Sequence, residues 1–300
     1  MNYIAEIEME GERIDKCIPL FCENLSRNYA AKLIKDGLVL VNGKSVKASY
    51  VLSEGDEVSF DVPPTSVPKI EAENIPLDII YEDEDVIVVN KPKGMVVHPA
   101  AGHYSGTLVN ALMYHCQGSL SGINGVMRPG IVHRIDMDTT GSVIACKNDK
   151  AHESIAAQLK EHSVKRCYRA IVHGVLKDDE GKIESYIGRS TSDRKKMAVV
   201  PQGRGKSAIT HYKVLKRFEK YTYVECRLET GRTHQIRVHM SHIGHPLLGD
   251  TVYGNLKSPF KLQGQCLHAY YLGFESPSTG EYIETIAPLP DYFSHLLEIL

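Results

Sequence analysis

The sequence lacks any apolar run long enough to cross a membrane and any recognisable leader. A membrane-spanning helix needs about 20 consecutive apolar residues, and no stretch of the 300 residues approaches that length. The first residues, Met1 to Glu6, are acidic and lack the pattern of a signal peptide. We therefore expect a cytoplasmic protein with no membrane partner.

Closely spaced cysteine pairs and net charge are also scarce. Seven cysteines are scattered along the chain without a Cys-x-x-Cys pair. An odd number without such pairs is typical of reduced thiols in a cytosolic protein rather than of a disulfide framework. The formal net charge is only −2. Because a near-neutral total does not by itself indicate a nucleic-acid partner, the distribution of the charges has to be considered.

The positive charge that is present gathers in two zones. From Arg13 to Tyr50 there are seven Lys or Arg residues and three Asp or Glu residues. From Arg189 to Lys220 there are ten Lys or Arg residues, against one Asp and one Glu. A basic run can be no more than a solvated surface. Two such zones in a nearly neutral chain favour a polyanionic partner.

Length and composition fit an ordinary globular protein with one large domain, or with a large and a small one. Hydrophobic residues make up 42% of the chain and charged residues 24%. Strand-like and helix-like runs are interspersed without a repeating β-α-β period, which favours an α+β fold with a mixed, mainly antiparallel sheet. The clearest strand-like runs are 77–81, 86–90, 167–172 and 222–228, and the clearest helix-like runs are 107–115 and 151–162.

The first 62 residues predict a small α/β-hairpin domain. Ser26 is a candidate N-cap for a helix over 27–36, which Gly37 would end. A strand-like run follows, and the pair Asn42-Gly43 after it is typical of a two-residue hairpin turn.

Three prolines between 62 and 68 indicate a semi-rigid linker. We therefore expect a first domain over 1–62 with its core at 13–60, a linker over 63–76, and a second domain over 77–300.

The nine residues from His133 to Gly141 carry the densest group of functional side chains. Strand-like runs precede them at 130–132 and follow them at 142–146, so they form a tight loop. Asp, Thr and Gly are ordinary turn residues, and the segment could be only a turn. The loop also brings the Asp136 carboxylate close to the basic side chain of Arg134. Loops on a rigid scaffold are common places for catalytic groups.

The order of these residues resembles a family signature. His-Arg-Ile-Asp-x-x-Thr-Thr-Gly is similar to the signature loop of the RluA-type pseudouridine synthases, in which Leu and Ser usually stand at the third and eighth positions. The runs 164–174 and 228–239 resemble two further family motifs, and the likeness extends from Leu77 to Pro290. The segment from Arg13 to Phe60 resembles a small RNA-binding module shared with a ribosomal protein. The resemblance implies a pseudouridine synthase fold and an enzyme that isomerises uridine in RNA.

The resemblance also implies roles for four residues. Asp136 would be the catalytic carboxylate, and Arg237 the arginine that pairs with it. Tyr168 would stack on the uracil or relay a proton, and Arg134 would fill the space that a flipped base leaves. Attack at the ribose C1′, attack at the base C6 and removal of the 2′ proton all need the same Asp. Isomerisation requires no redox change, so we expect no metal and no cofactor.

RNA is the expected partner of a monomeric chain. Within the family, the runs around 97–99, 106–110 and 128–134 are most similar to the branch of the ribosomal large-subunit pseudouridine synthase D, which modifies a hairpin loop of 23S ribosomal RNA. Another ribosomal or transfer RNA site is the alternative substrate. A non-catalytic RNA-binding or ribosome-assembly protein is the alternative class, but such a protein would be expected to lose the Asp or its Arg. The cations expected to contact RNA are Arg27, Lys32, Lys35, Lys195, Lys196 and Lys206.

Histidines near the third motif raise a rival hypothesis, a metallohydrolase. The spacing of these histidines is not a known zinc pattern, and Pro246 ends the expected helix among them. We therefore favour the reading without metal. The rival ligands are His234, His239, His242 and His245, with Cys226 nearby.

Three residues near the motifs are expected to be structural. We expect His133 to support the loop rather than to transfer protons. Asp138 would brace the loop through Thr139 or a backbone amide. Thr233 would cap a helix whose apolar face is formed by Ile236, Met240 and Ile243.

Overall fold

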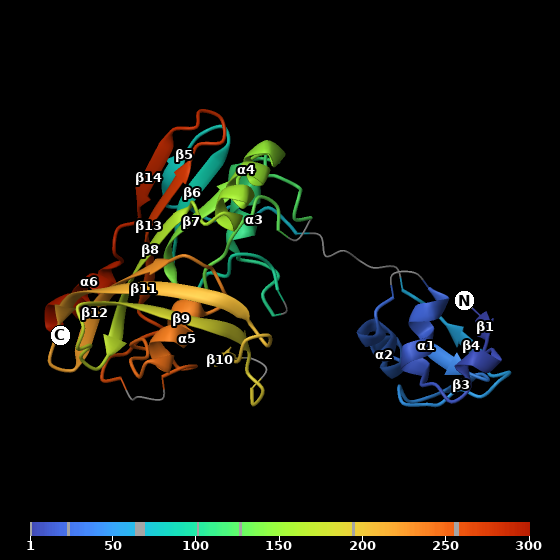
Figure 1. Cartoon of the computed structure of the whole chain (residues 1–300). Helices are drawn as coiled ribbons and strands as arrows, with labels where there is room; N and C mark the ends of the chain where they lie inside the picture. Colours follow the sequence, from blue (N-terminus) through green and yellow to red (C-terminus); the bar gives the residue numbers. More distant parts are fainter. Residues whose placement is uncertain are drawn as a thin grey trace. The chain divides into compact units, whose positions relative to one another are not determined.

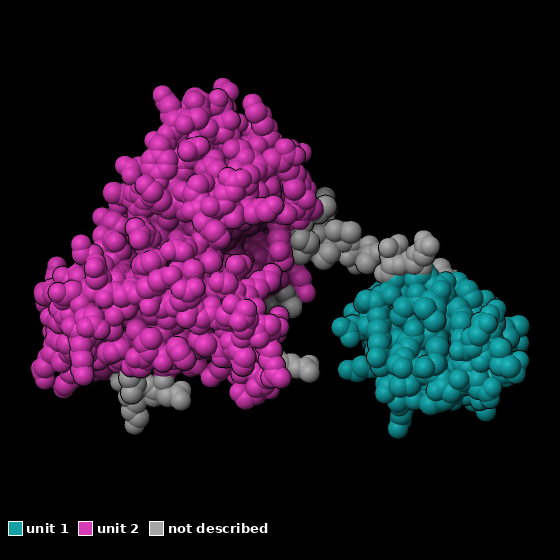
Figure 2. All heavy atoms as spheres, viewed as in Figure 1, with its two compact units in different colours: residues 1–67 teal, residues 68–300 magenta. Residues whose placement is uncertain are grey.

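The computed structural model describes residues 2–22, 25–63, 70–100, 102–125, 128–193, 196–254 and 258–300. The chain divides into two compact units, Met1–Val67 and Pro68–Leu300, which Figure 2 draws in different colours. Residues 70–76, expected in the linker, pack on the larger unit: Ile70 is buried in its core, and the Glu73 amide donates to the Asn110 carbonyl.

The small unit combines two helices with a short antiparallel sheet in the order β1-β4-β2-β3. Ser26 caps the second helix by accepting from the Tyr29 amide, as predicted. Asn42 and Gly43 have φ angles of 49° and 72°, the left-handed values that a tight hairpin turn requires. The elements are β1 (Asn2–Ile4), η1 (Ile7–Met9), α1 (Ile14–Phe21), α2 (Arg27–Lys35), β2 (Val39–Val41), β3 (Lys44–Ser45) and β4 (Glu57–Phe60).

The large unit is built on one sheet. In the described part of the chain ten strands form it, nine in the order β10-β9-β11-β12-β8-β13-β7-β6-β5, with β14 paired to β13. β13 and β7 pair in parallel, whereas the other described pairs are antiparallel. The mixed, mainly antiparallel sheet of the α+β prediction is therefore confirmed. The strands are β5 (Ile79–Glu82), β6 (Val86–Lys91), β7 (Thr140–Cys146), β8 (Lys165–His173), β9 (Glu180–Arg189), β10 (Met197–Val200), β11 (Lys206–Arg217), β12 (Tyr221–Leu228), β13 (Leu267–Glu275) and β14 (Tyr282–Ile286).

Helices cover both faces of this sheet. Alternate residues of β6 point to opposite faces: Val89 joins the cluster that contains α3, and Val88 joins the cluster that contains α4. In Figure 1, α3 and α4 lie near β5–β7, and α5 and α6 lie near the strands on the other side of β13. α5 shares the buried cluster of α3, so these two helices flank one face of the central strands. The helices are α3 (Leu108–His115), α4 (Asp149–Lys160), α5 (Gln235–His242) and α6 (Asp291–Ile299).

Two expectations for secondary structure need correction. The run 130–132 is not a strand, because Ile131 makes only an isolated bridge to Ala145. The second basic zone, expected only as a charged surface, contains β10 and β11. Lys206, Lys213 and Lys216 are exposed on β11, and only Ala208 and Thr210 of that strand are buried, so the sequence shows no regular alternation there. No helix in the described ranges is long and apolar enough to span a membrane.

Candidate active site

The loop from His133 to Thr139 leads into β7 and is held in place by buried polar side chains. Lys91 is fully buried, and its ammonium donates to three backbone carbonyls, including that of Met137 at 2.9 Å. Gln265 Nε2 donates to the Thr139 hydroxyl at 3.0 Å. These contacts fix the backbone on the C-terminal side of Asp136.

The expected brace, Asp138, has a different environment. Its Oδ1 is buried and has no hydrogen-bond partner among the described residues. Lys91 and Gln265 hydrogen-bond the residues on either side of Asp138, and the bracing role of Asp138 itself stays a prediction. His133 accepts from the Ile144 amide through Nε2 at 3.0 Å, and burial lowers the pKa of His133 to about 3. This neutral, hydrogen-bonded ring fits the structural role that we expected.

Gly141 ends the loop where β7 meets β13. Its φ of +105° is one that side chains rarely adopt, and a Cβ atom there would collide with the backbone of Ala269. A glycine at this position therefore permits the parallel pairing of the two strands.

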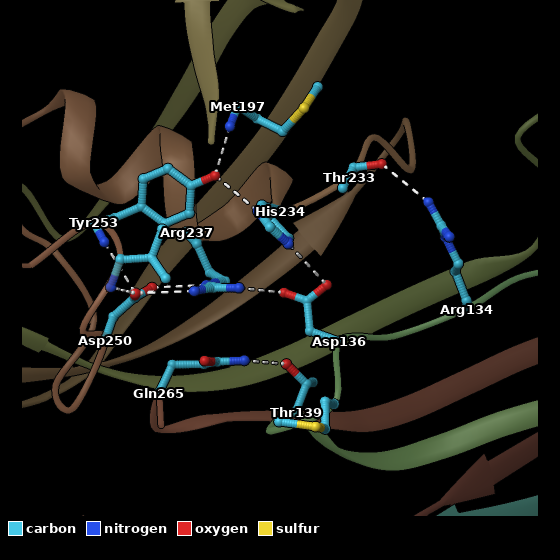
Figure 3. A network of polar contacts seen from close by, with 12 residues as sticks. Arg134, Asp136, Thr139, Met197, Thr233, His234, Arg237, Asp250, Tyr253 and Gln265 are labelled. Atoms are coloured by element: carbon cyan, nitrogen blue, oxygen red, sulfur yellow. Dashed lines mark hydrogen bonds and ion pairs between the residues drawn. The ribbon is translucent and has the colours of Figure 1, made fainter. Parts of the chain in front are cut away.

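Asp136 presents a partly exposed carboxylate to two basic side chains (Figure 3). Arg237 Nη1 donates to Asp136 Oδ2 at 2.8 Å, and His234 Nε2 lies 3.7 Å from Oδ1. The side chain of Asp136 is 24% exposed, whereas that of Arg237 is 7% exposed. Arg237 comes from α5 and points to the loop, so the structure brings together two residues that lie 101 positions apart.

Arg237 is also held by Asp250, which the sequence did not single out as a site residue. Arg237 Nε and Nη2 donate to the two oxygens of Asp250 at 2.7 and 3.0 Å. Burial alone would lower the pKa of Arg237, but the two carboxylates raise it above its ordinary value. Burial would raise the pKa of Asp250, and the contact with Arg237 lowers it instead. The guanidinium therefore stays charged and in place.

A second chain of contacts orients His234. The Met197 amide donates to the hydroxyl of Tyr253 at 2.9 Å, and that hydroxyl lies 2.8 Å from His234 Nδ1. If the hydroxyl donates to Nδ1, the neutral ring carries its proton on Nε2, which faces Asp136. His234 has φ 56° and is itself the N-cap residue of α5, so Thr233 is not the cap. The Thr233 hydroxyl accepts instead from Arg134 at 3.4 Å.

These groups open onto a cavity of about 630 Å³. Tyr168, on β8 in the centre of the sheet, lines the cavity together with Asp136 and Arg134. Tyr168 is 8% exposed, and burial raises the pKa of its hydroxyl. Asp136, Tyr168 and Arg134 thus share one cavity, and Arg237, the partner of Asp136, lines a smaller space beside it. A carboxylate, a neutral phenol and an exposed guanidinium around a half-open cavity suit the binding and reaction of a flat polar ring.

The comparisons with known proteins identify the family. A protein-family model described as RNA pseudouridylate synthase matches residues 85–242, which is more than half of the chain. The chain belongs to the RNA pseudouridylate synthase family. A second model, the S4 domain, matches residues 24–58, so the small N-terminal unit of this synthase is an S4 domain.

Relatives of the synthase match over almost its whole length. It is 54% identical to the uncharacterized RNA pseudouridine synthase YlyB of Bacillus subtilis, over 100% of this chain and 99% of that protein. It is 47% identical to the ribosomal large subunit pseudouridine synthase D of Zymomonas mobilis, over 98% and 95% of the two chains. Among solved structures, human RNA pseudouridylate synthase domain containing 1 has a TM-score of 0.60 and 28% identity, with 73% and 86% of the two chains covered.

The cations expected to contact RNA lie in both units of the synthase. Lys32 and Lys35 are exposed on α2. Arg27 donates to the buried Asp15 at 3.0 Å, so part of its charge is engaged within the S4 domain. In the large unit, Lys206 is exposed at the start of β11 and Lys196 is partly exposed before β10. Lys195 lies outside the described residues.

A basic hollow of about 780 Å³ adjoins the active-site cavity of the synthase. Arg134, Thr233 and His234 line both spaces. No carboxylate is found among the described residues that line the hollow. Its cations are Arg134, Arg189, Arg204, Lys206 and Arg232.

The histidines of the metal hypothesis do not converge. His239 contacts the hydroxyls of Thr210 and Ser185, and His245 contacts the carbonyl of His173. Within the described ranges, no three His, Cys, Asp or Glu side chains are grouped so that they could hold a metal ion.

Proposed function

We propose that this synthase isomerises uridines of large-subunit ribosomal RNA and that Asp136 is its catalytic carboxylate. The observation that carries the proposal is the ion pair between Arg237 and Asp136, whose carboxylate lines the cavity. The choice of RNA follows several relatives named ribosomal large subunit pseudouridine synthase D, at 41 to 47% identity. Location in the cytoplasm belongs to the same proposal.

The reaction needs an ionised carboxylate in a cavity that substrate closes. The bond between ribose C1′ and N1 breaks, a bond between C1′ and C5 forms, C5 loses a proton and N1 gains one. The atoms balance without an oxidant or a group donor. The guanidinium of Arg237, whose Nη1 lies 2.8 Å from Asp136 Oδ2, supplies a positive charge beside that carboxylate. The same carboxylate serves attack at C1′, attack at C6 and removal of the 2′ proton.

Tyr168 is proposed to contact the uracil ring. It lies on β8, belongs to the buried core and also lines the cavity. An aromatic ring in that place can stack on a base. Because burial raises the pKa of its hydroxyl, Tyr168 stays protonated near neutral pH and can donate a proton or a hydrogen bond.

Arg134 is proposed to replace the flipped base. It is exposed, and among the described residues its side chain donates one hydrogen bond, to the Thr233 hydroxyl at the long distance of 3.4 Å. Its guanidinium can therefore leave the protein surface at little cost. Flipping a base costs a few kcal/mol and less from a loop, which fits a hairpin-loop substrate.

Asp136→Asn tests the proposal. We expect the variant to fold and to bind RNA, and to lose pseudouridine formation by at least about 10⁴-fold, as expected for removal of the reacting group. Pseudouridine mapping in ribosomal RNA from a deletion strain, complemented with wild-type or variant protein, measures the loss and names the uridines. Near-normal turnover by the variant would exclude Asp136. Unchanged ribosomal RNA in the deletion strain would favour another RNA or the non-catalytic class.

A further inference from the structure

Arg166 is a buried cation that the proposed mechanism does not use. It lies on β8 and is only 7% exposed. Its Nε is buried without a hydrogen-bond partner, and it forms no ion pair with any carboxylate in the described ranges. An arginine remains charged even when buried, so the free enzyme carries an uncompensated guanidinium beside its active site.

Arg166 faces the same cavity as the reacting groups. It lines the 630 Å³ cavity together with Asp136 and Tyr168. Arg166 and Tyr168 are two positions apart on one strand, so their side chains leave the same face about 7 Å apart along β8. A ring stacked on Tyr168 would therefore lie beside Arg166, the next residue along β8 on the same face.

Gly231 keeps space for the guanidinium. A Cβ atom at position 231 would lie 2.7 Å from Arg166 Nη1, so any larger residue would displace it. Arg232, the next residue, lines the same cavity and anchors its own guanidinium by donating from Nε to the Ser207 carbonyl at 2.8 Å. Two guanidinium groups therefore meet at this wall of the cavity.

The electrostatics of this wall favour an anion. Burial lowers the pKa of Arg166, and the charge of Arg232 lowers it further. Leaving a buried charge unpaired is costly. An anionic ligand that enters the cavity removes this cost and gains charge-assisted hydrogen bonds.

We propose that Arg166 is the receptor for a phosphodiester of the RNA, at a linkage next to the flipped uridine. This inference rests on the proposed function, because it takes the base held by Tyr168 to be the uridine. A phosphodiester suits the site better than a uracil carbonyl does, since two phosphate oxygens match the fork of a guanidinium and carry the missing negative charge.

A cycle of protein and RNA changes tests the inference. The RNA is a hairpin with the uridine that wild-type enzyme modifies, and its partners carry one neutral methylphosphonate, 5′ or 3′ of that uridine. Binding is measured in the Asp136→Asn background, which prevents turnover. With Arg166 present, one of the two neutral linkages should weaken binding by about 10- to 100-fold. The Arg166→Met variant should bind the native RNA about as weakly as the enzyme with Arg166 binds the RNA with the sensitive neutral linkage. Introducing that neutral linkage should not weaken the binding of Arg166→Met any further.

Control variants separate the subsite from general charge and from folding. Arg227→Met removes an exposed arginine of β12 and should leave the sensitivity to the neutral linkage unchanged. Gly231→Ala keeps the charge of Arg166 but shifts its guanidinium, so it should reduce the sensitivity of binding to the neutral linkage. This variant preserves the test if Arg166→Met does not fold. Equal losses from the neutral linkage with and without Arg166 would overturn the inference. Because binding is read without turnover, a chain that bound RNA but formed no pseudouridine would contradict only the proposed function.

Discussion

Arg237 donates to Asp136 with one nitrogen and to Asp250 with two others. Asp250 in turn accepts from the amides of Val252 and Tyr253, so its carboxylate is fixed by the backbone. The Asp250 side chain is fully buried and does not line the cavity, which makes it a positioning residue. The position of the reacting carboxylate therefore depends on a residue that substrate does not touch.

Asp250→Asn should loosen this arrangement. Removing one charge of a buried pair costs about 3 kcal/mol or more, so we expect a lower free energy of unfolding. We also expect kcat to fall by at least about tenfold with little change in KM. Steady-state kinetics and denaturant unfolding measure the two effects. Asp291→Asn, at an exposed carboxylate of α6, is the matched control. A change confined to KM would contradict the positioning role.

At this scale the sequence predicted the residues that carry motifs and missed those that support them. Asp136, Tyr168 and Arg237 were predicted by resemblance; in the structure Asp136 and Tyr168 line the cavity, and Arg237 pairs with Asp136. Asp250 was not predicted as a site residue, because its contact with Arg237 depends on how the chain turns after α5. The orientation of His234 depends on its left-handed backbone and on Tyr253, neither of which leaves a pattern in the sequence.

Among the elements, α5 contacts the sheet through a buried histidine as well as through Gln235. His239 is fully buried and contacts Thr210 of β11 and Ser185 of β9, each at 2.9 Å. Burial lowers the pKa of His239 to about 4. The ring is therefore neutral in the folded protein, and α5, which carries Arg237, is attached to the sheet through it.

The pKa of His239 predicts a loss of stability in mild acid. In the unfolded chain a histidine titrates near 6.5. Between pH 6.5 and 4 the unfolded chain binds one more proton than the folded chain, so the contribution is complete above pH 6.5 and falls as the pH drops toward 4. The stability lost by this route amounts to about 3 kcal/mol. His239→Gln should flatten the dependence of unfolding free energy on pH in this range. His295→Gln, at an exposed histidine of α6, should not. An equally steep curve for His239→Gln would exclude this histidine as the cause.

The elements themselves were predicted where their pattern was regular. The helices α2, α3 and α4 have apolar stripes and capping residues and were found close to their observed bounds. α1 and α6, which are as long as α3 and α2, were missed because neither begins with a side-chain cap, and α1 also contains Pro19. β11 was missed because lysines occupy many of its positions while Ala208 and Thr210 face the core.

On the scale of the whole molecule, positive charge occurs in both units although the total is close to zero. The S4 domain exposes Lys32 and Lys35, and the large unit exposes Lys206 near a hollow lined by cations. Binding to RNA should then depend on salt through each of these contacts, since every neutralised phosphate releases counterions.

Replacing Lys195, Lys196 and Lys206 by Ala should weaken RNA binding and lower the slope of log K against log salt by about 2, at about 0.7 for each contact with single-stranded RNA. Replacing Lys32 and Lys35 by Ala should lower the slope by about half to two thirds of the change in the triple variant. Lys16 and Lys182 pair with Glu12 and Glu184, so their joint replacement is the control and should change the slope little. Binding isotherms at several salt concentrations measure the slopes. An unchanged slope in the triple variant would exclude this surface from RNA contact.

The place of β13 in the sheet has a consequence for synthesis of the protein. β7 and β8 follow one another along the chain, but β13, from near the C-terminus, is inserted between them. Asp136 lies just before β7 and Tyr168 lies on β8, so the two sides of the cavity cannot come to their final separation until β13 has been made. A nascent chain that stops before residue 267 can hold every motif residue through Arg237 and still lack the strand that spaces them. Completion of the active site is therefore a late, long-range step of folding.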